Sequence, residues 1–147
     1  MSSNDRESHP DSQEARPRTP RLLVVDDELL LVEAIEVALG ERVDVLATAD
    51  PHEALASIDT GERYDAILLD VRMPEMDGIE LCARIAAISP SQARRVVFMT
   101  AATSEADGRL SDLPNTTLRK PLDLSRVDEL LSSWLPDDTR SARIKIA

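Results

Sequence analysis

Acidic residues follow two apolar runs of the chain at the point where each run ends. Leu22–Val25 is followed by Asp26 and Asp27, and Ala66–Leu69 is followed by Asp70. A continuous apolar run bounded by charge is typical of a strand that is buried on both faces of a sheet. Carboxylates are nucleophiles toward activated phosphoryl groups and ligands for hard divalent cations. These runs therefore predict an acidic site at the ends of buried strands.

A hydroxyl and an ammonium group occupy the same kind of position further along the chain. The run Val96–Met99 ends at Thr100, and the run Thr116–Arg119 ends at Lys120, directly before Pro121. Ligands of a doubly wound sheet bind in the crevice outside the carboxyl ends of its strands. We therefore expect the hydroxyl and the ammonium to lie beside the acids.

Strands alternate with helices along the whole central part of the chain. The strands are expected at 21–25, 43–47, 66–69, 95–100 and 116–119, and the helices at 28–39, 50–61, 78–88 and 123–135. The segment 101–113 contains helix-forming residues but also Gly108, which weakens a helix. This alternation predicts an α/β fold in which a parallel sheet carries helices on both faces.

The first predicted helix has more apolar residues than one buried face needs. Five of its side chains share one helical face and are expected to pack on the sheet, namely Leu31, Ala34, Ile35, Ala38 and Leu39. Four others lie off that face, Leu29, Leu30, Val32 and Val37. We expect some of these four to be exposed, where they form either a docking surface or ordinary apolar residues of a protein surface.

The helix predicted over 78–88 carries two apolar stripes. One stripe is formed by Ile79, Cys82 and Ala86, and the other by Leu81, Ile85 and Ile88. Two stripes predict that this helix has two neighbours, or one neighbour and a partner. Cys82 is the single cysteine, which excludes an internal disulfide, and its position predicts a place in the core.

Composition bounds the class of protein. The 147 residues suit one domain, which we place at 21–136 between a disordered polar tail at 1–20 and a second polar tail at 137–147. The formal net charge of -11 argues against direct binding to nucleic acid or to anionic membranes. The sequence shows no apolar signal-like start and no run long enough to span a bilayer, so we expect a cytoplasmic protein.

Taken in order, these residues resemble the receiver domain of the response regulators of two-component systems. The matching set consists of Asp26-Asp27, Asp70 with Pro74 and Gly78, Thr100, and Lys120-Pro121. The resemblance covers Arg21 to about Leu135 and implies a (βα)5 flavodoxin-like fold, doubly wound, with a five-stranded parallel sheet in the order 2-1-3-4-5.

The resemblance implies that Asp70 is the phosphoacceptor and that Mg²⁺ is the cofactor. Nearby carboxylates repel one another, and a bound cation relieves that repulsion. We expect Asp27 and Asp70 to bind the metal directly and Asp26 to act through a metal-bound water. The family supplies a third protein ligand, the backbone carbonyl two residues after the phosphoacceptor, which here belongs to Arg72.

Lys120 and Thr100 are expected to complete the site by stabilising the charge of the phosphoryl group. The chain departs from the family at Thr117, where most receivers carry Tyr or Phe three residues before the lysine. We therefore expect Thr100 to move on activation, while the readout through the segment 101–118 is unconventional. Arg72 and Ala102 stand at positions that modulate hydrolysis in the family.

These features predict a stand-alone receiver that is phosphorylated by a sensor histidine kinase or a phosphotransfer protein and signals to a partner protein in trans. Apart from self-phosphorylation and slow self-dephosphorylation, we expect no enzymatic activity. One alternative is a degenerate receiver that only binds partners. A magnesium-dependent phosphatase of the haloacid dehalogenase type is a poorer alternative, because Arg72 stands where that family has its second aspartate.

Overall fold

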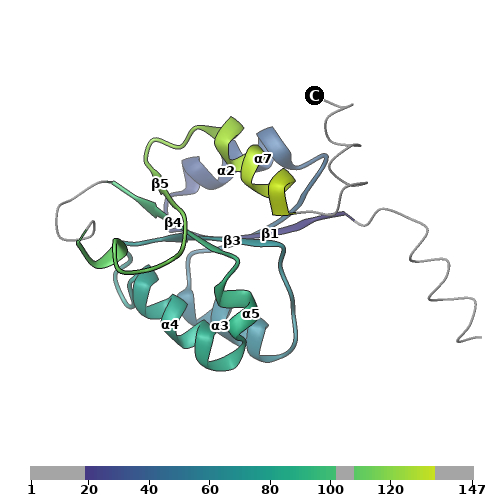
Figure 1. Ribbon diagram of the computed structural model, residues 1–147. Helices are drawn as coiled ribbons and strands as arrows, with labels where there is room; N and C mark the ends of the chain where they lie inside the picture. Colours follow the sequence, from purple (N-terminus) through teal and green to yellow (C-terminus); the bar gives the residue numbers. More distant parts are fainter. Residues whose placement is uncertain (1–18, 102–107, 135–147) are drawn as a thin grey trace, which may run out of the picture.

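Runs rich in Val, Leu and Ile form five parallel strands in one sheet (Figure 1). The structure is a computed structural model that describes residues 19–101 and 108–134 of the chain. The strands are β1 (Arg21–Val25), β2 (Asp44–Thr48), β3 (Ala66–Asp70), β4 (Val96–Thr100) and β5 (Thr117–Arg119). Their order across the sheet is β2-β1-β3-β4-β5, with every pair parallel, which confirms the predicted doubly wound fold.

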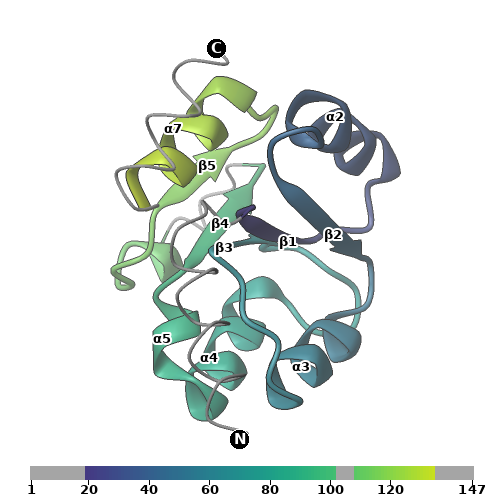
Figure 2. The ribbon, with the colours of Figure 1, turned by 90° about the vertical axis from the view of Figure 1, so that its right-hand side faces the viewer.

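Helices cover both faces of this sheet. They are α2 (Leu29–Leu39), α3 (Pro51–Asp59), α4 (Gly78–Ile88), α5 (Pro90–Ala93) and α7 (Leu124–Trp134). Figures 1 and 2 show α2 and α7 on one face and α3, α4 and α5 on the other. Among the described helices, none has the length and apolarity that a bilayer crossing requires. The predicted tails lie almost entirely outside the described residues, so the disorder of the tail at 1–20 stays a prediction.

The core has two apolar clusters, one on each side of the sheet. Alternate residues of a strand point to opposite faces. In β1, Leu23 and Val25 therefore join the cluster under α3 and α4, while Leu22 and Val24 join the cluster under α2 and α7. Because β1, β3 and β4 are covered on both faces, their sequences are continuous apolar runs rather than alternating ones.

Short polar side chains begin two of the helices. Asp50 accepts a hydrogen bond from the backbone N–H of His52 at 2.9 Å, and Asp77 accepts one from the N–H of Glu80 at 2.8 Å. These contacts satisfy N–H groups that have no partner within the helix. The predicted start of α3 at Asp50 is confirmed.

The buried face of α2 differs from the predicted one. Val32, Ile35 and Leu39 are buried, whereas Ala34 and Ala38 are exposed. The burial free energy of a side chain scales with its apolar area. Rotating the helix to bury valine in place of two alanines therefore gains more than it loses, and the predicted stripe through Ala34 and Ala38 is wrong.

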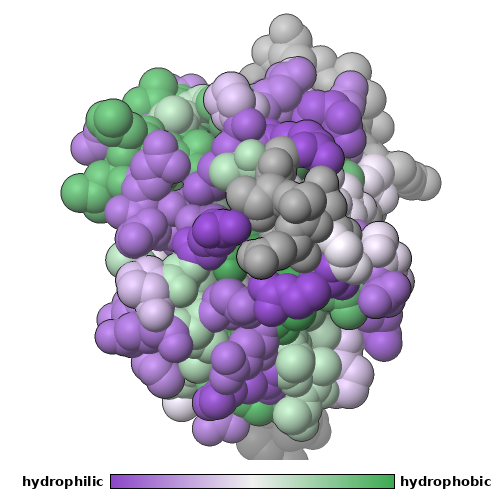
Figure 3. Space-filling view, turned by 90° about the vertical axis from the view of Figure 1, so that its left-hand side faces the viewer, coloured by the Kyte–Doolittle hydropathy of each residue, from purple (hydrophilic) through white to green (hydrophobic). Residues whose placement is uncertain are grey.

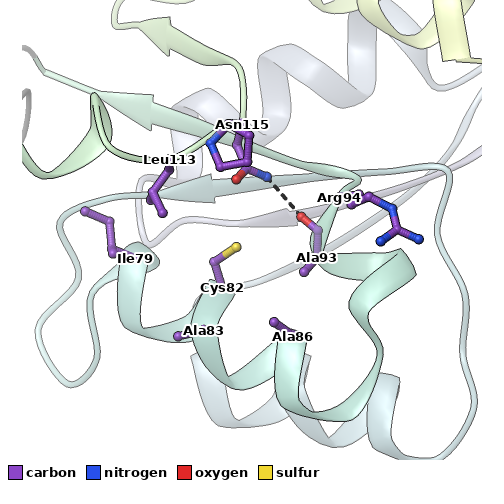
Figure 4. Close-up of a pocket in the computed structure, with 9 residues that line it drawn as sticks. Ile79, Cys82, Ala83, Ala86, Ala93, Arg94, Leu113 and Asn115 are labelled. Atoms are coloured by element: carbon purple, nitrogen blue, oxygen red, sulfur yellow. Dashed lines mark hydrogen bonds between the residues drawn. The ribbon is translucent and has the colours of Figure 1, made fainter.

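The segment after α4 also departs from the sequence prediction. The helix does end at Ile88, but Pro90 then begins the short helix α5. Leu81 and Ile85 pack on the sheet, but Ile88, which was predicted to share their stripe, is 38% exposed because it lies at the end of the helix. The stripe formed by Ile79, Cys82 and Ala86 faces an apolar pocket of about 480 Å³ (Figure 4). The rest of that pocket is lined by Ala83, Ala93, Arg94, Leu113, Pro114 and Asn115.

Candidate functional site

The carboxyl ends of four strands hold the predicted site residues. Asp70 and Thr100 are the last residues of β3 and β4, and Asp26 and Lys120 directly follow β1 and β5. Backbone hydrogen bonds fix this alignment, since the N–H of Lys120 donates to the carbonyl of Thr100 at 2.8 Å. The parallel register therefore brings together groups that are separated by almost the whole length of the domain.

Lys120 lies among three carboxylates. Its ammonium nitrogen is 2.9 Å from Oδ2 of Asp26, 3.3 Å from Oδ2 of Asp70 and 3.4 Å from Oε1 of Glu28. The side chain of Asp26 is fully buried and that of Asp70 is 9% exposed, whereas that of Glu28 is 56% exposed. Sequence reasoning placed Lys120 beside the acids but did not include Glu28 in the site.

Three of the acids are close enough to share one cation. Asp26, Asp27 and Asp70 each offer a carboxylate oxygen, and these oxygens lie within 4.8 Å of one another. Asp27 is exposed while the other two are buried. Oxygen-only ligands with an open side suit Mg²⁺, which keeps several of its waters. The residues present therefore fit the predicted ion.

The loop after β3 holds Asp70 in place. The backbone N–H of Arg72 donates to Oδ1 of Asp70 at 3.2 Å, and the carbonyl of Arg72 as a metal ligand stays a prediction. A Cβ atom at Gly78 would overlap the carbonyl oxygen of Asp70, so the start of α4 approaches the strand end only because this residue is glycine. Met73 and Met76 are buried in the core and anchor the loop between them.

The ionisation of the site reflects the burial of its groups and the presence of neighbouring charges. Burial, and then the charge of Asp26, raise the pKa of Asp70 to about 6, although Lys120 and the N–H of Arg72 act in the opposite direction. Burial alone would lower the pKa of Lys120, but its hydrogen bond to Asp26 and the charges of Asp70 and Asp26 outweigh burial and raise it. The lysine is thus held as a cation, and the carboxylate of Asp70 is poorly neutralised.

Thr100 and Thr117 lie on the side of the sheet near β5. Thr100 is 3% exposed at the end of β4. Thr117, at the position of the family's aromatic residue, is half-buried at the start of β5 and pairs in register with Phe98. Ala102 lies outside the described residues. Residues 108–110 form a helical turn, and Arg109 in this turn makes an ion pair with Asp77 at 2.9 Å.

An exposed apolar surface adjoins the site on α2. Leu29 is 73% exposed, Leu30 is 76% exposed and Val37 is 86% exposed. These are three of the four apolar residues that lie off the predicted buried face of this helix, and the fourth, Val32, is buried. Figure 3 shows apolar side chains gathered over α2 at the upper left of the face that carries the site. A depression of about 270 Å³ links Leu30 to Glu28 and Lys120.

This sheet order, with three acids and a lysine at the carboxyl ends of the strands, defines a receiver domain. A family profile described as the response regulator receiver domain matches residues 22–132. The chain therefore belongs to the receiver family of two-component phosphorelay signalling, in which receivers act with histidine kinases and downstream effectors.

Two of the curated relatives are regulatory proteins. The transcriptional regulatory protein TcrA of Mycobacterium tuberculosis is 44% identical over 66 residues, which cover 44% of this chain and 26% of TcrA. A response regulatory protein of Shewanella oneidensis is 30% identical over 122 residues, which cover 82% of this chain and 50% of that protein. The chain thus spans between about a quarter and a half of the length of these relatives.

Solved structures agree with this assignment. The receiver domain of the sensor histidine kinase PA1611 from Pseudomonas aeruginosa, which has magnesium coordinated in its active site cleft, is 29% identical with a TM-score of 0.65. That similarity covers 80% of this chain and 98% of the other. The chemotaxis protein CheY4 of Vibrio cholerae is 28% identical with a TM-score of 0.67, covering 80% of this chain and 100% of CheY4.

Proposed function

We propose that the chain accepts a phosphoryl group on Asp70 from a histidine of a sensor kinase or a phosphotransfer protein. In this proposal the phosphorylated chain then signals to a partner protein in trans. The observation that carries the proposal is the placement of Asp70, a buried carboxylate at a strand end that lies beside two further acids and 3.3 Å from Lys120. A cytoplasmic location belongs to the same proposal.

The chemistry assigned to the site residues follows from these positions. An oxygen of Asp70 attacks the phosphorus, the phosphorus–nitrogen bond of the donor breaks, and its electron pair returns to the ring nitrogen of the protonated histidine, which leaves as neutral imidazole. Lys120 pairs with a phosphoryl oxygen, and the hydroxyl of Thr100 donates to another. A Mg²⁺ ion bound by Asp27, Asp70 and the carbonyl of Arg72, and through water by Asp26, would supply further positive charge against the phosphoryl oxygens.

Activation is proposed to depend on Thr100 without an aromatic partner. A phosphoryl group adds charge and strong hydrogen-bond acceptors at Asp70, and Thr100 lies at the neighbouring strand end. Thr117 has no ring to swing inward, so the change is expected to spread along the backbone of 101–118. Backbone amide spectra of this region that stay the same on phosphorylation would contradict the proposal.

The test of phosphoacceptance is incubation with acetyl phosphate and Mg²⁺, with Asp70→Asn as the control. A receiver that self-dephosphorylates slowly and is otherwise no enzyme takes up close to one phosphoryl group per chain, and the variant takes up none. Turnover of many substrate molecules would instead indicate a phosphatase. No label on the wild-type chain would indicate a module that only binds partners.

The exposed leucines of α2 are proposed as the docking surface for the phosphodonor protein. Leu30 lines the depression that leads to Lys120, and Leu29 is exposed next to it in the chain. An apolar surface at this position fits a helix that carries the donor histidine. Leu30→Asp is expected to slow transfer from a kinase about tenfold while leaving phosphorylation by acetyl phosphate nearly unchanged.

Ala87→Asp is the matched control, because it adds the same charge to an exposed position of α4 on the opposite face of the sheet. Equal slowing of Leu30→Asp with both phosphodonors, or equal slowing by the two variants with the kinase, would remove α2 as the docking surface.

A further inference from the structure

Glu28 is a charged neighbour of Lys120 that the sequence pattern does not assign to the site. It precedes the first turn of α2 and accepts a hydrogen bond from the ammonium of Lys120 at 3.4 Å, across 92 residues of sequence. Its side chain makes no capping hydrogen bond to the helix. Instead, the N–H of Glu28 is bound by Oδ1 of Asp26 at 2.8 Å. The carboxylate of Glu28 therefore does not cap the helix, and it contacts Lys120 instead.

The three acids around Lys120 differ in what it would cost to release each of them. An ammonium group has three N–H donors, and Asp26, Asp70 and Glu28 together can occupy all three. Asp26 is fully buried, and a buried carboxylate that loses its cation is strongly destabilised. Glu28 is 56% exposed, so water can replace the ammonium at little cost. Glu28 is thus the partner that Lys120 can exchange.

We propose that Glu28 is a positioning residue that competes with the phosphoryl group for the ammonium of Lys120. Without a phosphoryl group, the lysine contacts Glu28 at the mouth of the site. When Asp70 carries one, the lysine exchanges Glu28 for a phosphoryl oxygen, and the exposed carboxylate returns to water. The charge of Glu28 also repels the incoming anion. Both effects weaken the hold of the site on a phosphoryl group.

This inference rests on the proposed phosphoacceptance and is tested with trifluoroberyllate, an anion that mimics the phosphoryl group. Its binding is followed by ¹⁹F NMR at saturating Mg²⁺ and low ionic strength. Glu28→Gln is expected to bind the anion roughly two- to fivefold more tightly than wild type, the range of an exposed ion pair. The difference is expected to shrink at 1 M salt, where charges are screened within about 3 Å.

Glu36→Gln is the matched control, because it removes the same charge from an exposed position about two turns further along α2. Tighter binding by Glu28→Gln alone, lost in high salt, supports the inference. Equal binding by Glu28→Gln and wild type, weaker binding by that variant, or the same tightening in both variants overturns it. A wild-type chain that binds no trifluoroberyllate overturns the proposed function and the inference together. The outcomes named before it overturn the inference alone, so the two failures are distinguishable.

Discussion

The two ends of the sheet both bury polar side chains, but they treat them in opposite ways. At the amino end, the side chain of Gln92 accepts a hydrogen bond from the N–H of Tyr64 at 2.8 Å and donates to the carbonyl of the same residue at 3.0 Å. Asp65 accepts from the backbone N–H of Arg21 at 2.7 Å, and the guanidinium of Arg21 lies 4.9 Å from the ring centre of Tyr64. Each of these buried groups has a partner of complementary kind.

At the carboxyl end, like charges are gathered instead. Asp26, Asp27 and Asp70 lie together with Lys120 as the cation in contact with two of them. The raised pKa of Asp70 shows that one lysine does not compensate the burial and the neighbouring acid. Buried polar groups that are fully paired stabilise a fold. Carboxylates that are crowded together stabilise it less, but they bind cations and react more readily than paired ones. The difference separates the structural end of the sheet from the functional one.

Removing Lys120 should have the largest effect and should be confined to the carboxyl end. Lys120→Ala is expected to slow phosphorylation by acetyl phosphate at least about 100-fold, because the site loses the cation that faces the developing charge. Arg84→Ala, which removes an exposed cation of α4 that pairs with Glu80, should leave the rate unchanged. The measurement is the initial rate of label incorporation. A fall of less than tenfold would mean that Lys120 is not part of the chemistry.

Removing the amide of Gln92 should produce the converse result. Gln92→Leu leaves the N–H and the carbonyl of Tyr64 buried without their partner, and is expected to lower the free energy of unfolding by about 2 to 3 kcal/mol. The rate of phosphorylation of the folded variant should stay within about twofold of wild type. Urea unfolding and label incorporation measure the two quantities. Loss of phosphorylation without loss of stability would contradict the division between the two ends.

Much of the acidic site could be predicted from the sequence, because Asp26, Asp70 and Thr100 each directly follow an apolar run and Lys120 follows a short, more polar strand. Asp26, Asp70, Thr100 and Lys120 need only the rule that parallel strands end at one edge of the sheet. The sheet order came from the resemblance, and the structure confirms it. No distance between these groups can be obtained at that level.

Other features could not be predicted, because they depend on competition between side chains. The contact of Glu28 with Lys120 joins residues 92 positions apart and depends on rotamers. Pro90 is the first residue of α5, but in the sequence a proline at this point equally indicates that the preceding helix has ended, so α5 could not be predicted. Val32 is buried because larger side chains decide the rotation of α2. Gln92 looks like an ordinary surface residue until Tyr64 is placed beside it.

The pH dependence of stability should show directly the burial of the Asp70 carboxylate beside Asp26. Because its pKa is raised from 3.8 to about 6, the native state binds this proton more tightly than the unfolded chain. The resulting stabilisation is complete below pH 3.8 and is lost as pH rises from 3.8 to about 6. Above pH 6 without metal, Asp70→Asn should therefore be more stable than wild type, on the order of 1 to 2 kcal/mol. Urea unfolding in a chelator at pH 7.5 and pH 4.5 measures this difference.

The difference in stability between Asp70→Asn and wild type should shrink at pH 4.5. It should also shrink at pH 7.5 when Mg²⁺ is added, because the ion stabilises only the chain that binds it well. An equal difference at both pH values would show that Asp70 is not strained by its neighbours, and the contrast between the ends of the sheet would lose its electrostatic basis.

The smallest expected effect belongs to Arg21 at the amino end. Its guanidinium lies over Tyr64 and pairs with Glu62 at 2.9 Å, while its backbone N–H alone binds Asp65. Arg21→Ala keeps the backbone contact and removes both of these side-chain contacts. It also removes the ion pair with Asp44 at 3.7 Å and the hydrogen bond to the carbonyl of Arg63 at 3.1 Å, so it should cost about 1 kcal/mol of stability. The loss should depend little on pH between 5 and 8, in contrast to the behaviour of Asp70→Asn. A loss with the same pH profile as that variant would mean that the two ends of the sheet are electrostatically coupled rather than separate.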